Sequence, residues 1–123
     1  MSEIDFRIIL RKPIYPVIII SADQLYSAFN IKQLAKGCVN AIPIEDKEIV
    51  KVIDSTGEEF WYSMGNYALS PGFSSRKWTK KHVIEMYNKR SNIIDTNFQF
   101  PLKSLSSKRL DSIIGELCER LKV

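Results

Sequence analysis

Basic residues gather in the segment SSRKWTKKHVIEMYNKR at positions 74–90, which holds six Lys or Arg residues and one acidic residue. Its apolar spacing predicts a helix with Thr79 as the N-cap. Cations in a first helical turn oppose the helix dipole, but together with the free N–H groups they favour an anion such as phosphate. The candidate anion- or nucleic-acid-binding residues are Arg76, Lys77, Lys80 and Lys81. The alternative is that these side chains only solvate the helix.

Aromatic residues form the second candidate site. In Phe60-Trp61-Tyr62 the alternation of a strand places Trp61 on the face opposite its two neighbours. Trp is enriched at interaction hot spots, and a ring beside lysines adds a stacking surface. The candidate partner or ligand contacts are Trp61, Tyr62, Tyr67 and Trp78. If helices cover both faces of the sheet, these rings are core residues instead.

Catalytic chemistry has little support in the sequence. His82 is the sole histidine, and no Gly-rich phosphate loop, G-x-S-x-G or H-E-x-x-H motif occurs. The acidic residues around the predicted turns match no EF-hand spacing and are typical of solvated turns. They are Glu45, Asp46, Glu48, Asp54, Glu58 and Glu59. We therefore expect no catalytic residue, no metal site and no cofactor, and we favour a protein that is not an enzyme.

The net charge of +4 is unevenly distributed along the chain. Residues 1–40 carry +2, residues 41–70 carry −4 and residues 71–123 carry +6. Such a division can steer a partner or favour association between copies of the chain. Alternatively, the oppositely charged regions neutralise each other within the fold.

The length of 123 residues predicts one domain that spans positions 1–123. The start of the chain has no signal-peptide pattern, and the longest apolar run, at 14–20, is too short to cross a bilayer. Cys38 and Cys118 lie far apart and belong to no C-x-x-C motif, so we expect both to be buried, reduced thiols. These features predict a cytoplasmic protein with no membrane partner.

The first third of the chain predicts strands and one helix. Residues 4–10 alternate with a period of two, and the β-branched run at 17–20 is typical of a buried strand. Ser21 and Gln24 have the spacing of a capping box, which predicts a helix that reaches Gly37. Asn30 could divide this helix in two, because Asn caps a helix better than it propagates one.

The rest of the chain predicts a hairpin and two further helices. Strands at 47–53 and 58–63 flank a turn in which Gly57 takes the left-handed conformation. Residues 38–44 suggest a strand, 65–73 a loop, and 92–102 a short strand or a loop. The last helix is predicted to begin after a Ser106 cap. Its buried stripe consists of Leu110, Ile113, Ile114, Leu117 and Leu121.

The order of these elements predicts an α+β domain with an antiparallel or mixed sheet of about four to six strands and about three helices, mainly on one face. The sequence favours a binding module that acts through a protein–protein surface, with a second copy of the chain as one candidate partner. One alternative is nucleic-acid or anion binding through residues 76–90. The other is a small-molecule-binding or enzymatic domain with an aromatic pocket near residues 58–67. An accessory or immunity-type protein of a bacterial mobile element is one setting for such a binding module, although no motif in the sequence carries this assignment.

Overall fold

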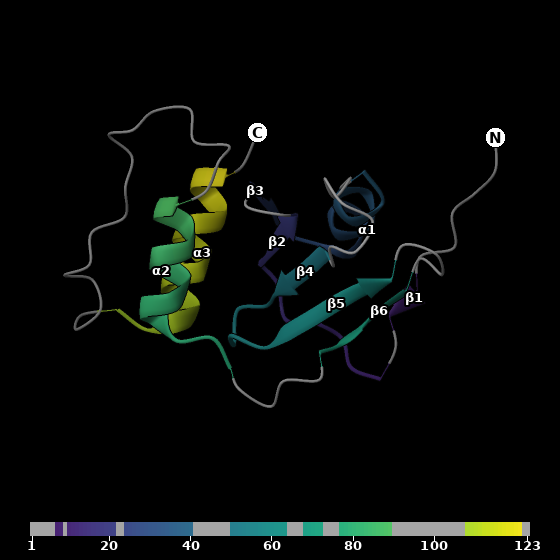
Figure 1. Ribbon diagram of the computed structural model, residues 1–123, viewed down its shortest axis with the longest axis horizontal. Helices are drawn as coiled ribbons and strands as arrows, with labels where there is room; N and C mark the ends of the chain where they lie inside the picture. Colours follow the sequence, from purple (N-terminus) through teal and green to yellow (C-terminus); the bar gives the residue numbers. More distant parts are fainter. Residues whose placement is uncertain are drawn as a thin grey trace.

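The computed structural model describes residues 7–8, 10–21, 24–40, 50–63, 68–72, 77–89 and 108–121. They form one six-stranded sheet and three helices (Figure 1). The strands are β1 (Arg7–Ile8), β2 (Val17–Ser21), β3 (Gln24–Ala28), β4 (Val50–Ile53), β5 (Glu59–Ser63) and β6 (Ala68–Pro71). The helices are α1 (Ile31–Asn40), α2 (Lys80–Lys89) and α3 (Leu110–Leu121). The spatial order is β1-β6-β5-β4-β2-β3, in which β1 is parallel to β6 and all other pairs are antiparallel. The predicted α+β class with a mixed sheet is confirmed.

The two faces of the sheet are covered by different helices. Ile18 and Ile20 of β2 pack with α2 and α3, which lie side by side, whereas Val17 and Ile19 pack with α1 on the opposite face (Figure 1). A strand that is buried on both faces has no polar side, which explains the continuous apolar run in β2. Of the described helices, two therefore share one face, as predicted, and α1 lies on the other.

The predicted helix from a Ser21 cap to Gly37 is wrong before Asn30, where the sequence had allowed a division, and is confirmed from Ile31 onward. Gln24–Ala28 forms the edge strand β3, which pairs with β2 from Ser21↔Gln24 to Val17↔Ala28. The helix α1 begins only at Ile31, after Asn30, whose side chain accepts a hydrogen bond from the Gln33 N–H at 2.9 Å. Asn30 is thus a helix cap, and pairing with the apolar β2 overrides the helical signal before it.

Three further boundaries differ from prediction. Cys38 to Asn40, expected in a strand, belong to α1, and the Cβ that Gly37 lacks would lie 2.5 Å from Ile19 Cδ1, so this glycine permits close packing rather than ending the helix. The expected loop at 65–73 contains β6. The last helix begins at Leu110 rather than after Ser106. The possible strand at 92–102 lies outside the described residues.

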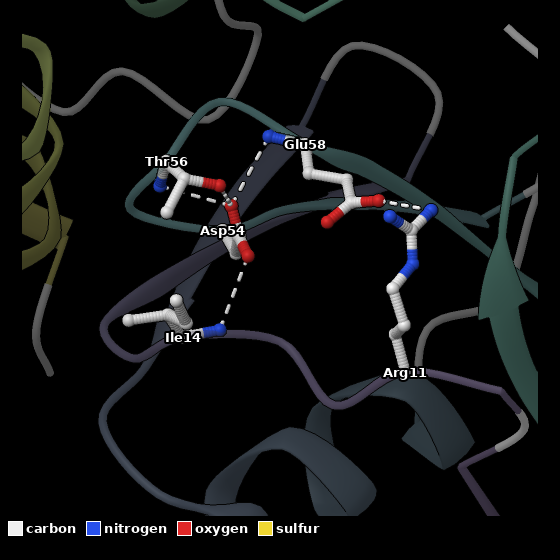
Figure 2. Close-up of polar contacts among 5 residues, drawn as sticks. All are labelled: Arg11, Ile14, Asp54, Thr56 and Glu58. Atoms are coloured by element: carbon white, nitrogen blue, oxygen red, sulfur yellow. Dashed lines mark hydrogen bonds and ion pairs between the residues drawn. The ribbon is translucent and has the colours of Figure 1, made fainter. Parts of the chain in front are cut away.

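The β4–β5 hairpin is confirmed, and its turn is held together by a buried carboxylate (Figure 2). Asp54 Oδ1 accepts hydrogen bonds from the Thr56 N–H at 2.9 Å, the Thr56 hydroxyl at 2.6 Å and the Glu58 N–H at 3.1 Å. Asp54 Oδ2 accepts the Ile14 N–H at 3.1 Å. Gly57 has a φ of +86°, as the turn prediction required. Asp54 is 1% exposed, so the expectation that it is a solvated turn residue is wrong.

Both cysteines are free and fully buried, as predicted, one in each of the two cores. Burial raises the pKa of Cys38 to about 12, because the interior disfavours the thiolate. Burial, with a smaller contribution from the charge of Glu119, raises the pKa of Cys118 to about 12. The Cys118 thiol also donates to the Val17 carbonyl at 3.3 Å. These thiols are therefore core residues and not nucleophiles.

Candidate functional site

One open hollow of about 420 Å³ lies beside α2, and we call it the α2 hollow. Its wall is made by one side of α2 and by the residues just before this helix, together with one residue at the start of β5. The lining residues are Glu59, Lys77, Trp78, His82, Glu85, Met86 and Lys89. The helical spacing of residues 82, 85, 86 and 89 places them on one face of α2, and Trp78 lies just before the helix. The formal charges, two carboxylates and two lysines with His82 neutral, cancel.

Glu59 lines the hollow and accepts hydrogen bonds from two tryptophans, one on β5 and one just before α2. The Trp78 indole N–H donates to Glu59 Oε1 at 3.0 Å, and the Trp61 indole N–H donates to Glu59 Oε2 at 2.6 Å. Glu59 and Trp61 share a face of β5 because they are two residues apart. Gly72 makes room for the second ring, since a Cβ at this position would lie 2.7 Å from Trp61 Nε1. A half-buried carboxylate thus fixes the orientation of both rings.

The β4–β5 turn sets where α2 begins. The Trp78 N–H donates to the Gly57 carbonyl at 2.8 Å. A Cβ on Gly57 would lie 2.8 Å from the Trp78 carbonyl oxygen and from Leu110 Cδ2, so the turn approaches the starts of both α2 and α3. Thr79 then caps α2, because its hydroxyl accepts the His82 N–H at 3.2 Å. The cap is the predicted one.

The three candidate anion-binding lysines that the structure describes do not converge on one point. Arg76 lies outside the described residues, and exposed Lys77 lines the α2 hollow. The Lys80 ammonium donates to the Lys108 carbonyl at 3.0 Å, which ties the start of α2 to the residues before α3. Lys81 is exposed and approaches Glu85 at 4.0 Å. Each described lysine therefore has a different surrounding, and a carboxylate lies near two of them.

The aromatic candidates also separate. Tyr62 is 4% exposed and packs in the core beneath α1, so it cannot contact a partner and that prediction is wrong. Tyr67 lies outside the described residues. Trp61 and Trp78 are half-buried and are brought together by Glu59. Only Trp78 lines the hollow, where its ring also packs against the core that contains Val83.

The remaining acidic candidates have structural partners or fall outside the described residues. Glu58 forms an ion pair with Arg11, whose side chain is 63% exposed (Figure 2). Glu45, Asp46 and Glu48 lie in the segment 41–49, which the structure does not describe. Among the residues it does describe, no three His, Cys, Asp or Glu side chains group as metal ligands would. His82 is exposed, as expected for a surface histidine.

Comparison with protein-family models, with curated proteins and with solved structures found no match to this chain. Within the described residues, no helix has both the length and the apolar character needed to span a bilayer. The α2 hollow offers an indole ring, a thioether, an imidazole and charged groups of both signs.

Proposed function

We propose that the protein is a non-enzymatic binding module that holds a protein partner at the α2 hollow. The observation that supports this is the placement of Trp78 and Met86 in an open hollow surrounded by Glu59, Glu85 and Lys89. Trp and Met are enriched in the centres of protein interfaces, and charged residues occupy their rims. Glu59 holds the Trp78 ring in place before binding, so less side-chain freedom is lost when a partner docks.

Nucleic-acid binding through residues 76–90 is less well supported by the same surface. A phosphate backbone favours a stripe of cations without carboxylates. Here Glu59 and Glu85 share the hollow with Lys77 and Lys89. The Lys80 ammonium is engaged with the Lys108 carbonyl, away from a common phosphate path. Charge pairs of both signs suit a protein surface with alternating charges better than a polyanion.

A small-molecule or enzymatic site near residues 58–67 is also less well supported. The volume of about 420 Å³ would suit a small ligand. Ligand pockets, however, bury most of the ligand, whereas the α2 hollow is open. Tyr62, which would have lined an aromatic pocket there, is in the core.

For the binding module we propose a cytoplasmic accessory or immunity-type role.

The test is a pair of matched substitutions in the first turn of α2. His82→Glu and Lys81→Glu each place a new carboxylate near Glu85, and each favours the helix dipole. His82 lines the hollow, whereas Lys81 does not. Wild-type protein and both variants are immobilised and used to capture proteins from the producing cell, with quantitative mass spectrometry. The captured protein is then purified and its dissociation constant is measured by calorimetry.

We expect His82→Glu to weaken binding by about tenfold or more and Lys81→Glu to change it by less than about threefold. Equal effects of both variants would argue against the hollow as the contact. A bound small molecule in native mass spectra of the protein, lost in His82→Glu, would favour the small-molecule alternative. Light scattering of the purified protein tests whether the partner is a second copy of the chain.

A further inference from the structure

A second exposed surface lies in the connection between β1 and β2, far from α2 in the sequence. Leu10 is 87% exposed and Ile14 is 57% exposed, the two highest values among the large apolar side chains that the structure describes. Lys12, between them, is also exposed. We call residues 10–14 the β1–β2 loop. Single exposed apolar residues are common on protein surfaces, so exposure alone assigns no role.

Leu10 is unusual for a second and independent reason. Its φ of +71° lies in the left-handed region, where Gly or Asn is the ordinary choice and a bulky side chain is an outlier. Burial does not compensate for this strain, because the side chain is almost fully in solvent. A residue that is both strained and exposed gives the fold no evident benefit. Strain of this kind gathers at binding sites, so the outlier points to use of the Leu10 side chain.

The loop is held in place by the turn that follows β4. The Ile14 N–H donates to Asp54 Oδ2 at 3.1 Å, and the Ser55 N–H donates to the Ile14 carbonyl at 3.0 Å. Arg11 forms its ion pair with Glu58 on the same hairpin (Figure 2). Two backbone hydrogen bonds and one ion pair therefore hold Ile14 and Arg11, which follow Leu10 in the loop, against the hairpin. A loop fixed in this way loses little conformational freedom when it docks.

We propose that the β1–β2 loop is a second docking element, which inserts Leu10 into an apolar pocket with an acidic rim on a protein partner. The acidic rim follows from the charges of the loop. Residues 10–14 contain no Asp or Glu and two cations, Arg11, which pairs with Glu58, and Lys12, which is exposed. An electronegative rim on the partner would complement Lys12 and steer the encounter. This proposal does not depend on the α2 hollow.

A protein pocket fits these observations better than an anionic lipid surface. Basic and apolar side chains together can attract such a surface. A fluid bilayer, however, adapts to whatever conformation a loop adopts, so it gains nothing from a strained Leu10 in a loop whose Arg11 and Ile14 are held against the hairpin. A pocket of fixed shape does gain from it, because the side chain arrives in its bound position. Two inserted side chains would also make only a weak membrane anchor.

The experiment places a photo-crosslinking amino acid at position 10 and, as a control, at position 31. Ile31 is 53% exposed but lies at the start of α1 with an ordinary backbone conformation. Irradiation in the producing cell should give a discrete protein adduct from position 10 and none from position 31. The crosslinked peptide is mapped on the purified partner, and the same protein is tested for sedimentation with vesicles that contain phosphatidylserine.

The purified partner then distinguishes a docking loop from a merely strained one. We expect Leu10→Gly to weaken binding by about tenfold or more while the urea midpoint of unfolding stays the same or rises, because the strain is relieved. Lys12→Glu should weaken binding in a salt-dependent way, and Lys32→Glu on α1 should not. The proposal is overturned by the lack of a specific adduct at position 10, by unchanged affinity in Leu10→Gly, or by vesicle binding that Leu10→Gly abolishes.

Discussion

Glu58 and Glu59 are neighbours in the chain, but they serve two regions that use charge in different ways. Glu58 belongs to the turn network, which Asp54 organises and in which the carboxylate oxygens, backbone N–H groups and the Thr56 hydroxyl bond to one another. Glu59 belongs to the α2 hollow, where it accepts hydrogen bonds from two indole rings. Among the described residues, the other charged side chains of the hollow do not bond to Glu59. The polar groups of the turn network are hydrogen-bonded to one another, whereas the hollow is open.

The difference teaches how polar residues can be assigned from their surroundings. A buried carboxylate with four hydrogen bonds, such as Asp54, is part of the architecture, because any new contact would have to break an existing one. Exposed Lys77 and Lys89, beside a fixed ring, can still gain contacts. We therefore predict that substitutions in the turn network change stability, and that substitutions in the hollow change binding.

The largest effect on the free energy of unfolding is expected from the two buried cysteines, Cys38 and Cys118. A thiol with an ordinary pKa of 9.0 in the unfolded chain has a pKa of about 12 at Cys38 and at Cys118 in the folded protein. The folded state therefore holds both protons more tightly, and this contribution is complete below pH 9.0 and is lost as the pH rises toward 12. Urea unfolding across this range should show a falling free energy of unfolding.

Variants identify the thiols as the cause. Cys38→Ala and Cys118→Ala should each show a shallower decline with pH than the wild type, although both start from a lower stability. A decline that is identical in all three proteins would assign it to other groups. Thiol titration without reductant should detect two groups in denaturant and almost none in the native protein.

The next largest effect is expected for Asp54→Ala, which leaves three backbone N–H groups without their acceptor. We expect a loss of about 3 kcal/mol in the free energy of unfolding. Thr56→Ala, which removes only the hydroxyl hydrogen bond, should cost about 1 kcal/mol. Calorimetric titration should show partner binding at the hollow unchanged in both variants at temperatures where they are folded. A loss of binding without a loss of stability would reverse our assignment of the turn network.

A smaller effect is expected for Glu59→Gln. The Gln amide has one oxygen, so it can accept a hydrogen bond from one indole but not from the other. Because Glu59 and both indoles are half-buried, we expect a loss of about 1 kcal/mol in the free energy of unfolding. The tryptophan emission should shift to longer wavelength as one ring becomes better hydrated. Glu58→Gln is the matched control and should cost less than about 0.5 kcal/mol, because its Arg11 partner is mostly exposed. Equal costs would contradict the difference between the two regions.

The smallest effect is expected when Arg76, Lys77, Lys80 and Lys81 are all replaced by Gln. If these cations do not follow a phosphate backbone, binding to duplex and single-stranded DNA should be equally weak before and after the change. A wild-type dissociation constant tighter than about 10⁻⁶ M at physiological salt, lost in the variant together with its salt dependence, would favour the nucleic-acid alternative.

The sequence predicted the parts of the fold that local patterns determine. The β4–β5 hairpin, the Thr79 cap and the apolar stripe of α3 follow from spacing within a few residues. The segment Gln24–Ala28 was misassigned because its capping-box spacing is a local signal, whereas its strand depends on pairing with β2. Tyr62 was misassigned because its burial depends on core residues that are distant in the sequence, such as Val17 and Leu34.

The candidate site was only partly predictable. Lys77 and Trp78 were identified because basic and aromatic residues stand together in the sequence. The role of Glu59 was missed, because Trp78 reaches it across 19 positions of the chain. The hydrogen bond between Glu59 and Trp61 did have a local signal, since residues two apart on a strand share a face. Leu10 could not be identified as strained, because its left-handed φ leaves no mark in the sequence.

One measurement tests the central claim most directly, namely that the α2 hollow, and not the turn network, receives the partner. The chain has two tryptophans, so its indole N–H groups give two NMR signals, which Trp61→Phe assigns. We predict that the captured partner, added to labelled protein, shifts the Trp78 indole signal and the amide of His82, while the amides of Thr56 and Glu58 keep their positions. An unchanged Trp78 signal at saturating partner would contradict the account.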